Sequence, residues 1–503
     1  MNKISFDELK NITNVIGSNN IDSVTLFDYF RIAHNTSVLE SSFSNPLFFV
    51  LYLTHEEALD AWYINDIDMR SNLLELMCNY PNYTFIVDKT MKSKLKNCDY
   101  KYIMVEDVNQ TIDDLFNYFK SKSHAKTIAV TGSVGKTTCV GLIESILKQK
   151  YNVFRIYSKR ITPLVLKSTI INNLNDEIDY IVLENSIYYH DHVKILAGLL
   201  NPEISAILNI ESSHLGIEKL KTIDDICFYK SYIMQCSKKC FLIKGDPYLD
   251  KLHLDSDILK YDDKTILNNS NLQLERIDLD KITIENDCFN IDNQIVIEPF
   301  MLSSLSKKQY AVAYEIGKEL GLTNVEIKKG MEEYIPVENR VQKEIAFGKT
   351  ILFDGDVTTY ERIKELSDNM YQNKYLVLRK VGSAENTLRI ANIKDFFDRY
   401  KKVYIFGDVE YLEELKDGDN VVVVNNHDFM QDLKGTIIYH YSGYFRVWDN
   451  YDENNLNIYD KEKYPIIKEE KWKKRYYYYM GGIGKIILAW QIQKMLGKTA
   501  RIL

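Results

Sequence analysis

An apolar run, a glycine-containing turn and a helix-like run follow one another in this chain, and together they limit what it can fold into. The apolar run is residues 127–130, the turn is Thr-Gly-Ser-Val-Gly-Lys-Thr-Thr at 131–138, and the helix-like run is residues 139–147. A strand that leads through glycines into a helix N-terminus makes an anion site, because backbone N–H groups and the helix dipole face the same point. The sequence therefore predicts a strand–loop–helix unit that binds the phosphates of ATP or GTP.

Residues of the turn have separate roles in this interpretation. The backbone amides of the loop face the phosphates, Lys136 adds a point charge for the β- and γ-phosphates, and Thr137 can hold Mg²⁺ through its hydroxyl. The general phosphate-loop pattern has a glycine five residues before Gly135, where this chain has Val130. The motif is thus the shorter TGSxGKTT form. The candidate nucleotide-binding residues of the turn are Gly132, Ser133, Val134, Gly135, Lys136, Thr137 and Thr138.

Composition narrows the class of protein. A length of 503 residues favours about three domains. The formal net charge of −8, spread along the chain, argues against general nucleic-acid binding. We expect no transmembrane segment, because no apolar run reaches about 18 residues, and no signal peptide, because residues 1–20 are polar with mixed charge. Seven scattered cysteines, an odd number, are typical of a reduced protein, so we expect a cytoplasmic location.

The region after the turn alternates between apolar strand-like and helix-like runs. The strand-like runs are residues 179–184, 204–209 and 240–243. Repeated strand–helix units form a parallel sheet with helices on both faces. Ligands of such sheets lie beyond the carboxyl ends of the strands, so Glu184 and Asn209 are expected beside the phosphate loop. From residue 257 to 299 short β-like runs suggest a small added sheet. A helix is expected over 306–320, followed by a capping box of Thr323 and Glu326.

Strand–helix alternation also occurs on both sides of this region. Before it, β-like runs at 47–53 and 83–87 alternate with helical patterns at 56–62 and 111–119; after it, strands are expected at 350–353, 375–378, 403–406, 421–424 and 436–439, with a helix at 360–370. We predict an α/β protein of three domains, in which a central parallel-sheet ATPase domain is flanked by an N-terminal α/β domain and a Rossmann-like C-terminal α/β domain. The expected boundaries are 1–122, 123–338 and 339–503.

The motif and the residues that follow it resemble the Mur ligase family, the ATP-dependent amide-bond-forming enzymes of peptidoglycan assembly. The family's phosphate loop is TGTxGKTT-like, and TGSVGKTT is similar to it, including the absent early glycine. Glu184 is similar to the family's strand-end glutamate. Asn209 and His214 are similar to its Asn-Ile and His-Leu pairs, and Lys230 stands where the family has a lysine that is often carbamoylated.

Further matches lie later in the chain. The turn at 245–247, Gly-Asp-Pro, is similar to an acidic proline turn of the family. Arg340 looks like the arginine that opens the last domain, and Asp354 looks like the aspartate after the next strand. The resemblance covers the middle of the chain well, the last part moderately and the first part thinly. Among family members it is nearest to the D-alanyl-D-alanine-adding type, with a specialised relative acting on another cell-surface precursor as an equal possibility.

The resemblance implies roles for these residues. Lys136, Lys230 and His214 would be catalytic. Thr137 and Glu184 would hold one Mg²⁺, and His214 with a carbamoylated Lys230 would hold a second. Asn209, Arg340 and Asp354 would contact ATP, the last two after a domain closure. The expected substrates are ATP, an amino acid or short peptide, and a carboxylate precursor that the resemblance implies is UDP-linked. The expected state is a monomer or small homo-oligomer.

Some features depart from the family pattern. Residues 300–304, Phe-Met-Leu-Ser-Ser, lack the asparagine that contacts adenine in the family, and the Asp-Asn-Pro-Arg box of some members is absent. A second glycine-lysine turn at 481–485 lacks a following Ser or Thr, which favours a helix-entry turn. Two alternatives stay open: a polyglutamate-type ligase without a UDP site, and a nucleotide-binding partner subunit without ligase chemistry.

Overall fold

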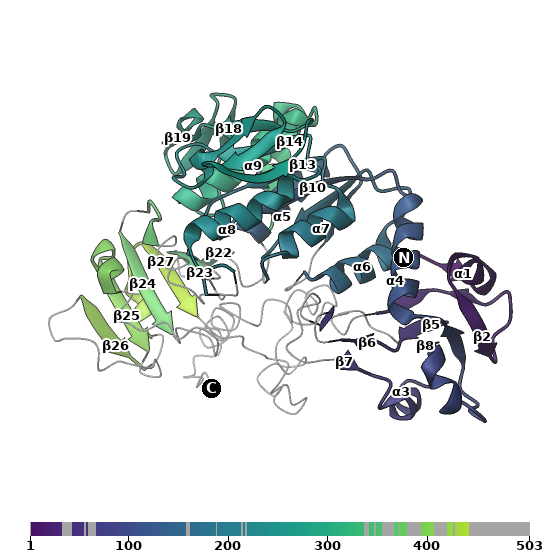
Figure 1. Ribbon diagram of the computed structural model, residues 1–503. Coiled ribbons are helices and arrows are strands. Elements are labelled where there is room, and N and C mark those ends of the chain that lie inside the picture. The colour runs from purple at the N-terminus through teal and green to yellow at the C-terminus, as the bar shows by residue number, and fades with distance from the viewer. Residues whose placement is uncertain are drawn as a thin grey trace. The chain divides into compact units, whose positions relative to one another are not determined.

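The computed structural model describes most of the chain up to residue 441 (Figure 1). The described residues are 2–32, 43–54, 57–58, 67–156, 161–187, 189–212, 215–216, 219–336, 342–346, 349–354, 367–371, 373–379, 394–406, 420–425 and 428–441. They divide into two compact units, one of Met1–Lys136, Ile143–Asp278 and Glu315–Gly330, and the other of Thr137–Leu142, Leu279–Tyr314 and Met331–Leu503. Within this described part, no helix combines the length and apolar character needed to span a bilayer.

A six-stranded parallel sheet carries the predicted phosphate loop. Its strand order is β11-β12-β10-β13-β14-β18, and every neighbouring pair is parallel. Of these six strands, β10 comes first in the chain, and it lies between two strands that come later, β12 and β13. Its carboxyl end is therefore at the point where the strand order reverses. The strands are β10 (Lys126–Thr131), β11 (Val153–Ile156), β12 (Tyr180–Glu184), β13 (Ile204–Ile207), β14 (Lys239–Ile243) and β18 (Gln273–Ile277).

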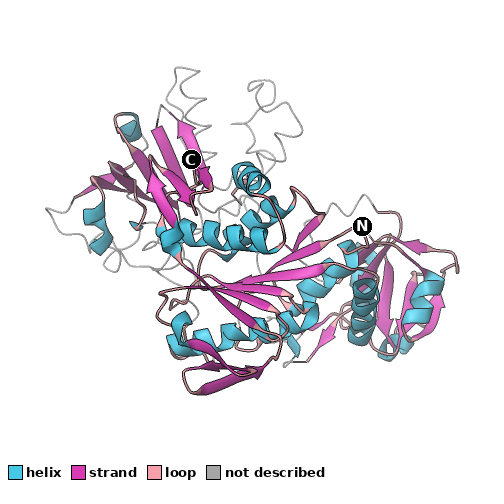
Figure 2. Ribbon diagram, turned by 90° about the horizontal axis from the view of Figure 1, so that it is seen from above, coloured by secondary structure: helices cyan, strands magenta, loops and turns pink. Residues whose placement is uncertain are grey.

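Helices connect these strands as the sequence predicts. They are α5 (Lys136–Leu147), α6 (Pro163–Asn173), α7 (His192–Leu200) and α8 (Ile223–Lys230), followed by the 3₁₀ helix η3 (Ser231–Met234). Figure 2 shows helices lying against the strands of the sheets. The four inner strands are largely buried, as expected for a parallel sheet covered on both faces, whereas most residues of the edge strands β11 and β18 are half-buried or exposed.

Two further α/β sheets confirm the predicted fold class. The N-terminal sheet has the order β2-β9-β8-β5-β4, with only β2 antiparallel. The C-terminal sheet has the order β22-β23-β27-β24-β25-β26, with only β22 antiparallel. Their strands are β2 (Val15–Asn19), β4 (Tyr29–Arg31), β5 (Pro46–Phe49), β8 (Thr84–Asp88), β9 (Tyr102–Val105), β22 (Gln342–Ala346), β23 (Lys349–Asp354), β24 (Lys374–Arg379), β25 (Lys402–Phe406), β26 (Val421–Val424) and β27 (Thr436–Tyr441).

The region 257–299 differs from the single added sheet that was expected. It contributes to two three-stranded antiparallel sheets, β15-β16-β17 and β19-β20-β21, and β18 between them joins the central sheet as its last strand. The polar punctuation of this region hides β18 because it is an edge strand with only one neighbour. The added strands are β15 (Leu252–Asp255), β16 (Ile258–Tyr261), β17 (Lys264–Asn268), β19 (Ile282–Glu285), β20 (Cys288–Ile291) and β21 (Ile295–Ile297).

Local sequence signals set the ends of several helices. Thr323 and Glu326 form the predicted reciprocal cap, with Glu326 Oε2 accepting from the Thr323 N–H and hydroxyl, both at 2.8 Å, before α10 (Asn324–Glu333). The predicted helix at 306–320 is α9 (Ser304–Glu319), and the one at 111–119 is α4 (Val108–Ser121). The run at 47–53 is split into β5 and β6 (Tyr52–Leu53). Most of the expected helices at 56–62 and 360–370 lies outside the described residues.

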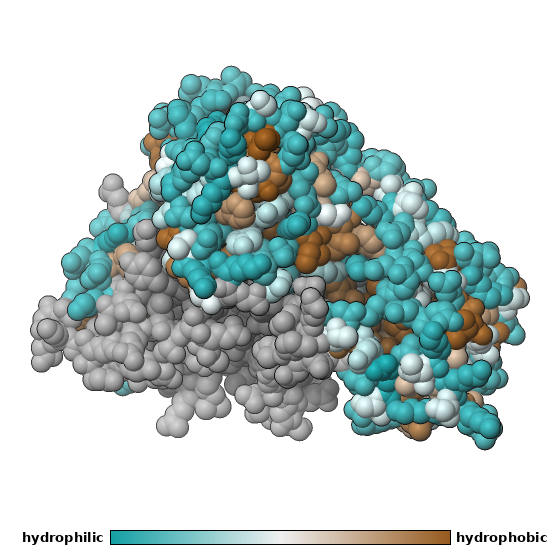
Figure 3. Space-filling view, viewed as in Figure 1, coloured by the Kyte–Doolittle hydropathy of each residue, from teal (hydrophilic) through white to brown (hydrophobic). Residues whose placement is uncertain are grey.

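On the face seen in Figure 3, hydrophobic side chains lie in small groups among hydrophilic ones.

The remaining elements are short. The elements not yet given are β1 (Ile4–Ser5), α1 (Phe6–Ile12), β3 (Leu26–Phe27), β7 (Ile67–Asp68), α3 (Leu73–Asn79), η2 (Lys89–Ser93), η4 (Leu249–Lys251), η5 (Leu279–Lys281), η6 (Lys394–Arg399) and η8 (Asp428–Gln431).

Candidate active site

The predicted phosphate loop connects β10 to α5. Gly132 has φ +150°, and a side chain there would bring its Cβ within 3.1 Å of Leu208 Cβ. Gly135 has φ +86° and directly precedes α5, whose first residue is Lys136. Both glycines hold backbone conformations that other residues adopt only with strain. The loop therefore has the glycine positions and the helix N-terminus that an anion site requires.

Asn209 lies just beyond β13 and is fully buried against this loop. Its Oδ1 accepts from Ser133 N at 3.0 Å and from Val134 N at 2.9 Å, and its Nδ2 donates to the Val134 carbonyl at 3.0 Å. The structure thus places Asn209 beside the loop, as predicted, but with its amide bonded to the loop backbone. Two of the loop amides that were expected to face phosphates instead donate to this side chain.

Two lysines converge on one carbonyl oxygen of the loop. Lys136 Nζ donates to the Gly132 carbonyl at 2.9 Å and to the Ser133 carbonyl at 3.1 Å. Lys230 Nζ, from the last residue of α8, donates to the same Gly132 carbonyl at 2.9 Å. The two lysines predicted to be catalytic are therefore brought together, although they are far apart in the sequence.

The amine of Lys230 is in an environment that disfavours its charged form. The side chain is fully buried, and this burial, together with the nearby Lys136 ammonium, lowers its pKa well below the usual lysine value. Cys227 and Glu184 oppose that change. A neutral amine is the form that reacts with CO₂ and the form that a buried site tolerates.

Glu184 ends β12 at the same edge of the sheet. Its side chain is half-buried, and its Oε1 accepts from the Ser186 hydroxyl at 3.2 Å. Glu184 lies opposite Val130 in the pairing of β12 with β10, directly before the phosphate loop. A partly accessible carboxylate beside a phosphate loop suits Mg²⁺, which prefers oxygen ligands and keeps several waters.

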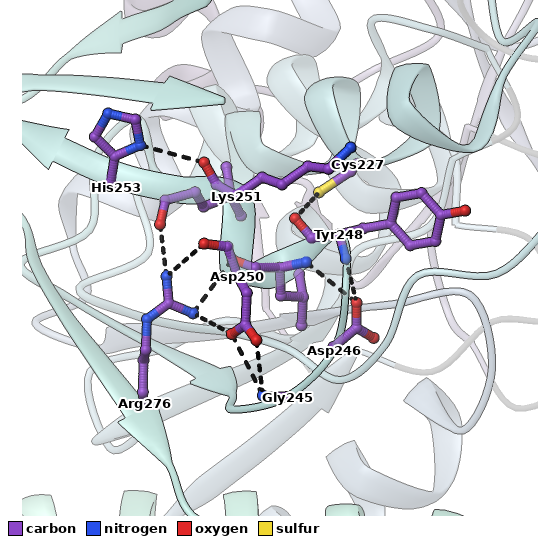
Figure 4. A network of polar contacts seen from close by, with 10 residues as sticks. Cys227, Gly245, Asp246, Tyr248, Asp250, Lys251, His253 and Arg276 are labelled. Carbon is purple, nitrogen blue, oxygen red and sulfur yellow. Dashed lines mark hydrogen bonds and ion pairs between the residues drawn. The ribbon is translucent and has the colours of Figure 1, made fainter. Parts of the chain in front are cut away.

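Asp246 supports this edge of the sheet, although the sequence reading gave it no function. Its Oδ2 accepts from Ile210 N at 3.3 Å, and its Oδ1 accepts from the N–H groups of Tyr248 and Leu249, both at 3.1 Å. Figure 4 shows Asp246 in this turn, next to Asp250, whose carboxylate accepts from Gly245 N and Arg276. The position of a Gly-Asp-Pro turn directly after an apolar strand was the sequence signal for it.

Other predicted residues are placed less fully. Thr137 and Thr138 are the second and third residues of α5, and Asp354 is the last residue of β23. His214 and Arg340 lie outside the described residues, so their roles stay predictions. Among described residues, no group of three or more His, Cys, Asp or Glu side chains is arranged to hold a metal.

The stretch that departs from the family's adenine-contacting sequence is used in packing. Met301 and Leu302 are buried, and Met301 belongs to the core of the C-terminal sheet. Ser303 and Ser306 donate to each other's hydroxyls through their N–H groups, both at 3.1 Å, and so cap α9. The stretch is therefore a structural connection in this chain.

Comparison with known proteins agrees with the sequence resemblance. Residues 130–317, which carry the loop, Glu184, Asn209 and Lys230, match the Mur ligase middle domain. The UDP-N-acetylmuramoyl-tripeptide--D-alanyl-D-alanine ligase of Borreliella burgdorferi is 24% identical over 341 residues, which cover 64% of this chain and 70% of that protein. The chain carries a Mur ligase middle domain.

Two solved structures share the fold of this chain over most of its length. MurF from Acinetobacter baumannii matches 89% of this chain and 98% of its own, with a TM-score of 0.64 and 14% identity. MurF ligase from Thermotoga maritima, solved in complex with ADP, matches 82% and 94%, with a TM-score of 0.59 and 17% identity. At these identities the likeness concerns the fold alone.

Proposed function

We propose that this chain is an ATP-dependent amide ligase that joins an amino acid or short peptide to the carboxylate of a larger precursor. The observation that carries the proposal is the meeting of Lys136 and the buried Lys230 at the Gly132 carbonyl of the phosphate loop, with Glu184 paired to the strand that precedes the loop. Phosphoryl transfer depends mainly on positioning and on neutralising charge. Lys136 supplies a positive charge, and Glu184 offers oxygen ligands to a cation that would supply more.

The reaction has two balanced steps. A carboxylate oxygen of the acceptor attacks the γ-phosphorus of ATP. The bond between the γ-phosphorus and the β,γ-bridging oxygen breaks, so that ADP leaves and an acyl phosphate forms. The neutral amine nitrogen of the second substrate then attacks the acyl carbon, and inorganic phosphate leaves as the amide forms. Lys136 neutralises charge on the transferred phosphoryl group. The amine must lose one proton in total, which passes to solvent or to the phosphate.

Mg²⁺ would be held by Glu184 and by Thr137. Thr137 follows the motif lysine, where a Ser or Thr hydroxyl binds Mg²⁺ in phosphate loops. When bound, the ion would neutralise phosphate charge. Lys230 fits carbamoylation because its amine is buried and disposed to be neutral. With His214, the resulting carboxylate would form a second cation site.

The substrates proposed here follow the named relatives. The Borreliella burgdorferi relative is named as a ligase that adds D-alanyl-D-alanine to a UDP-N-acetylmuramoyl-tripeptide. We propose a UDP-linked carboxylate precursor and a short peptide as the first pair to test for this chain, in the cytoplasm. Because the stretch at 300–304 departs from the family sequence, an acceptor other than the peptidoglycan precursor is the second candidate to test.

The test is phosphate release from ATP by the purified chain with Mg²⁺, measured with each substrate alone and with both together. Release that requires both the carboxylate precursor and the amine, with the ligated product identified by mass spectrometry, supports the proposal. Release without a UDP-linked acceptor but with a glutamyl acceptor indicates the polyglutamate-type alternative. ATP binding with no release under any pairing of substrates indicates the non-catalytic alternative and contradicts the proposal.

A further inference from the structure

The amide of Asn209 is hydrogen-bonded to the backbone of the phosphate loop. Ser133 N and Val134 N are both donors to Asn209 Oδ1, and the Val134 carbonyl accepts from Asn209 Nδ2. Ser133 N also donates to the Asn209 main-chain carbonyl at 3.0 Å. All three hydrogen bonds of this side chain are therefore made with the backbone of two consecutive loop residues, Ser133 and Val134.

The segment that follows Asn209 is bonded to the loop a second time. The Ser133 hydroxyl donates to the Glu211 carbonyl at 3.1 Å, and Glu211 N donates to the Ser133 hydroxyl at 2.8 Å. Ser133 is buried, so these bonds are made away from most of the solvent. Residues 209–211 thus hold Ser133 through both its backbone and its side chain.

Asp246 is hydrogen-bonded to the same segment. Its carboxylate accepts from Ile210 N, between Asn209 and Glu211, while its other oxygen accepts from two N–H groups of its own turn. Because Asp246 is nine-tenths buried, with 8% of its surface exposed, the bond to Ile210 is partly shielded from water. A continuous path of hydrogen bonds joins the turn after β14, the end of β13 and the phosphate loop.

We propose that Asn209 and Asp246 are positioning residues that hold the phosphate loop in its nucleotide-binding shape before the nucleotide arrives. This inference rests on the proposed function and deepens it. It assigns Asn209 to the loop and leaves the N-terminal residues of α5, together with Lys136, as the donors for phosphate. A loop that is held in advance loses less conformational freedom on binding, so the nucleotide binds more tightly.

The test is the affinity of purified variants for ADP with Mg²⁺, measured by calorimetry beside their thermal stability. Asn209→Ala removes these three side-chain hydrogen bonds. We expect ADP affinity to fall about tenfold or more, the decrease that follows from losing two or three hydrogen bonds that order the loop. Asn172→Ala is the matched control. Asn172 is also a buried asparagine with three side-chain bonds, two to Phe30 and one to Ser168. It should lose stability but keep its ADP affinity within about twofold.

A second pair keeps the test decisive if Asn209→Ala does not fold. Asp246→Asn can keep accepting from Tyr248 and Leu249 while presenting an amide N–H to Ile210 N, so it loses that bond selectively. Asp250→Asn changes a carboxylate of the same turn that accepts from Gly245 N and from Arg276. We expect weaker ADP binding only in Asp246→Asn, by about threefold, roughly the value of one such bond.

The outcomes separate the two ideas. If the wild-type chain does not bind ADP, the proposed function fails. If the wild type binds ADP and both Asn209→Ala and Asp246→Asn bind it equally well, the positioning role is overturned while the proposed function stands. A loss in Asn209→Ala with none in Asp246→Asn also contradicts the joint role, because it indicates direct contact between Asn209 and the nucleotide.

Discussion

At the scale of single residues, the most demanding position is Lys230. A fully buried lysine costs folding free energy when charged, yet this one lies beside a second ammonium at a shared carbonyl. A lysine at this position suits a chemical role better than a stabilising one, because an apolar side chain would fill the same space at a lower cost in folding free energy. Its protonation should therefore be visible in the stability of the whole chain.

Stability should depend on pH through Lys230. The folded-state pKa lies below the unfolded one, so between the two values the unfolded chain binds more protons and stability rises with pH. We expect the unfolding free energy of the wild type, compared with Lys230→Met, to rise from about pH 6 to about pH 9, by at most about 1.4 kcal/mol per unit. Urea unfolding in CO₂-free buffer measures this difference. A pH-independent difference would contradict a depressed pKa.

At the scale of elements, α10 packs against α5 at a glycine. A Cβ on Gly330 would lie 2.4 Å from Ile146 Cα and 2.8 Å from both Ile146 N and the Ser145 carbonyl oxygen. The Ser145 hydroxyl also donates to the Gly330 carbonyl at 2.7 Å. The two helices approach so closely because one of them has no side chain at the contact, and this contact supports the helix that begins at Lys136.

Gly330→Ala should therefore destabilise the chain, although alanine favours helices by about 1 kcal/mol over glycine. The backbone of Ile146 cannot move aside as a flexible side chain would, so we expect a net loss of about 1–3 kcal/mol. Gly17→Ala is the control, because a Cβ there meets nothing within 4 Å. Chemical unfolding of both variants gives the comparison, and a Gly330→Ala variant as stable as the wild type would show that the helices separate freely.

At this scale, sequence patterns predicted the secondary-structure elements better than they predicted the tertiary contacts between side chains. The strands at 350–353 and 421–424 were found because short apolar runs between polar segments have few other structures available. The phosphate loop, Glu184 and Asn209 were placed at one sheet edge by the rule for parallel strands. That rule could not show that Asn209 bonds to the loop, nor that Lys230 and Lys136 share a carbonyl, because both depend on tertiary distances. β11 and β18, the two edge strands of the central sheet, were missed because edge strands carry a weaker apolar signal.

At the scale of the whole molecule, nucleotide binding should be coupled to stability. A ligand that binds only the folded chain stabilises it by about 2.7 kcal/mol at one hundred times its dissociation constant. The loop, its lysine and the segments that hold it come from β10, β13, α5 and α8, so occupancy should stabilise much of the central sheet together. The amount of this stabilisation then reports on the site without any need for ligation.

Lys136→Ala should remove this coupling. The side chain bonds to the Gly132 and Ser133 carbonyls, and its loss takes away the positive charge expected to neutralise phosphate. We expect the wild type to melt at higher temperature as ADP with Mg²⁺ is added, and Lys136→Ala to show little or no rise over the same range, together with loss of ATP turnover. Lys148→Ala is a suitable control, because that exposed lysine of the same helical region pairs with Glu144. A Lys136→Ala variant that melts and turns over ATP like the wild type would remove the loop from the site, because no charge in the motif would then be needed to hold the terminal phosphates.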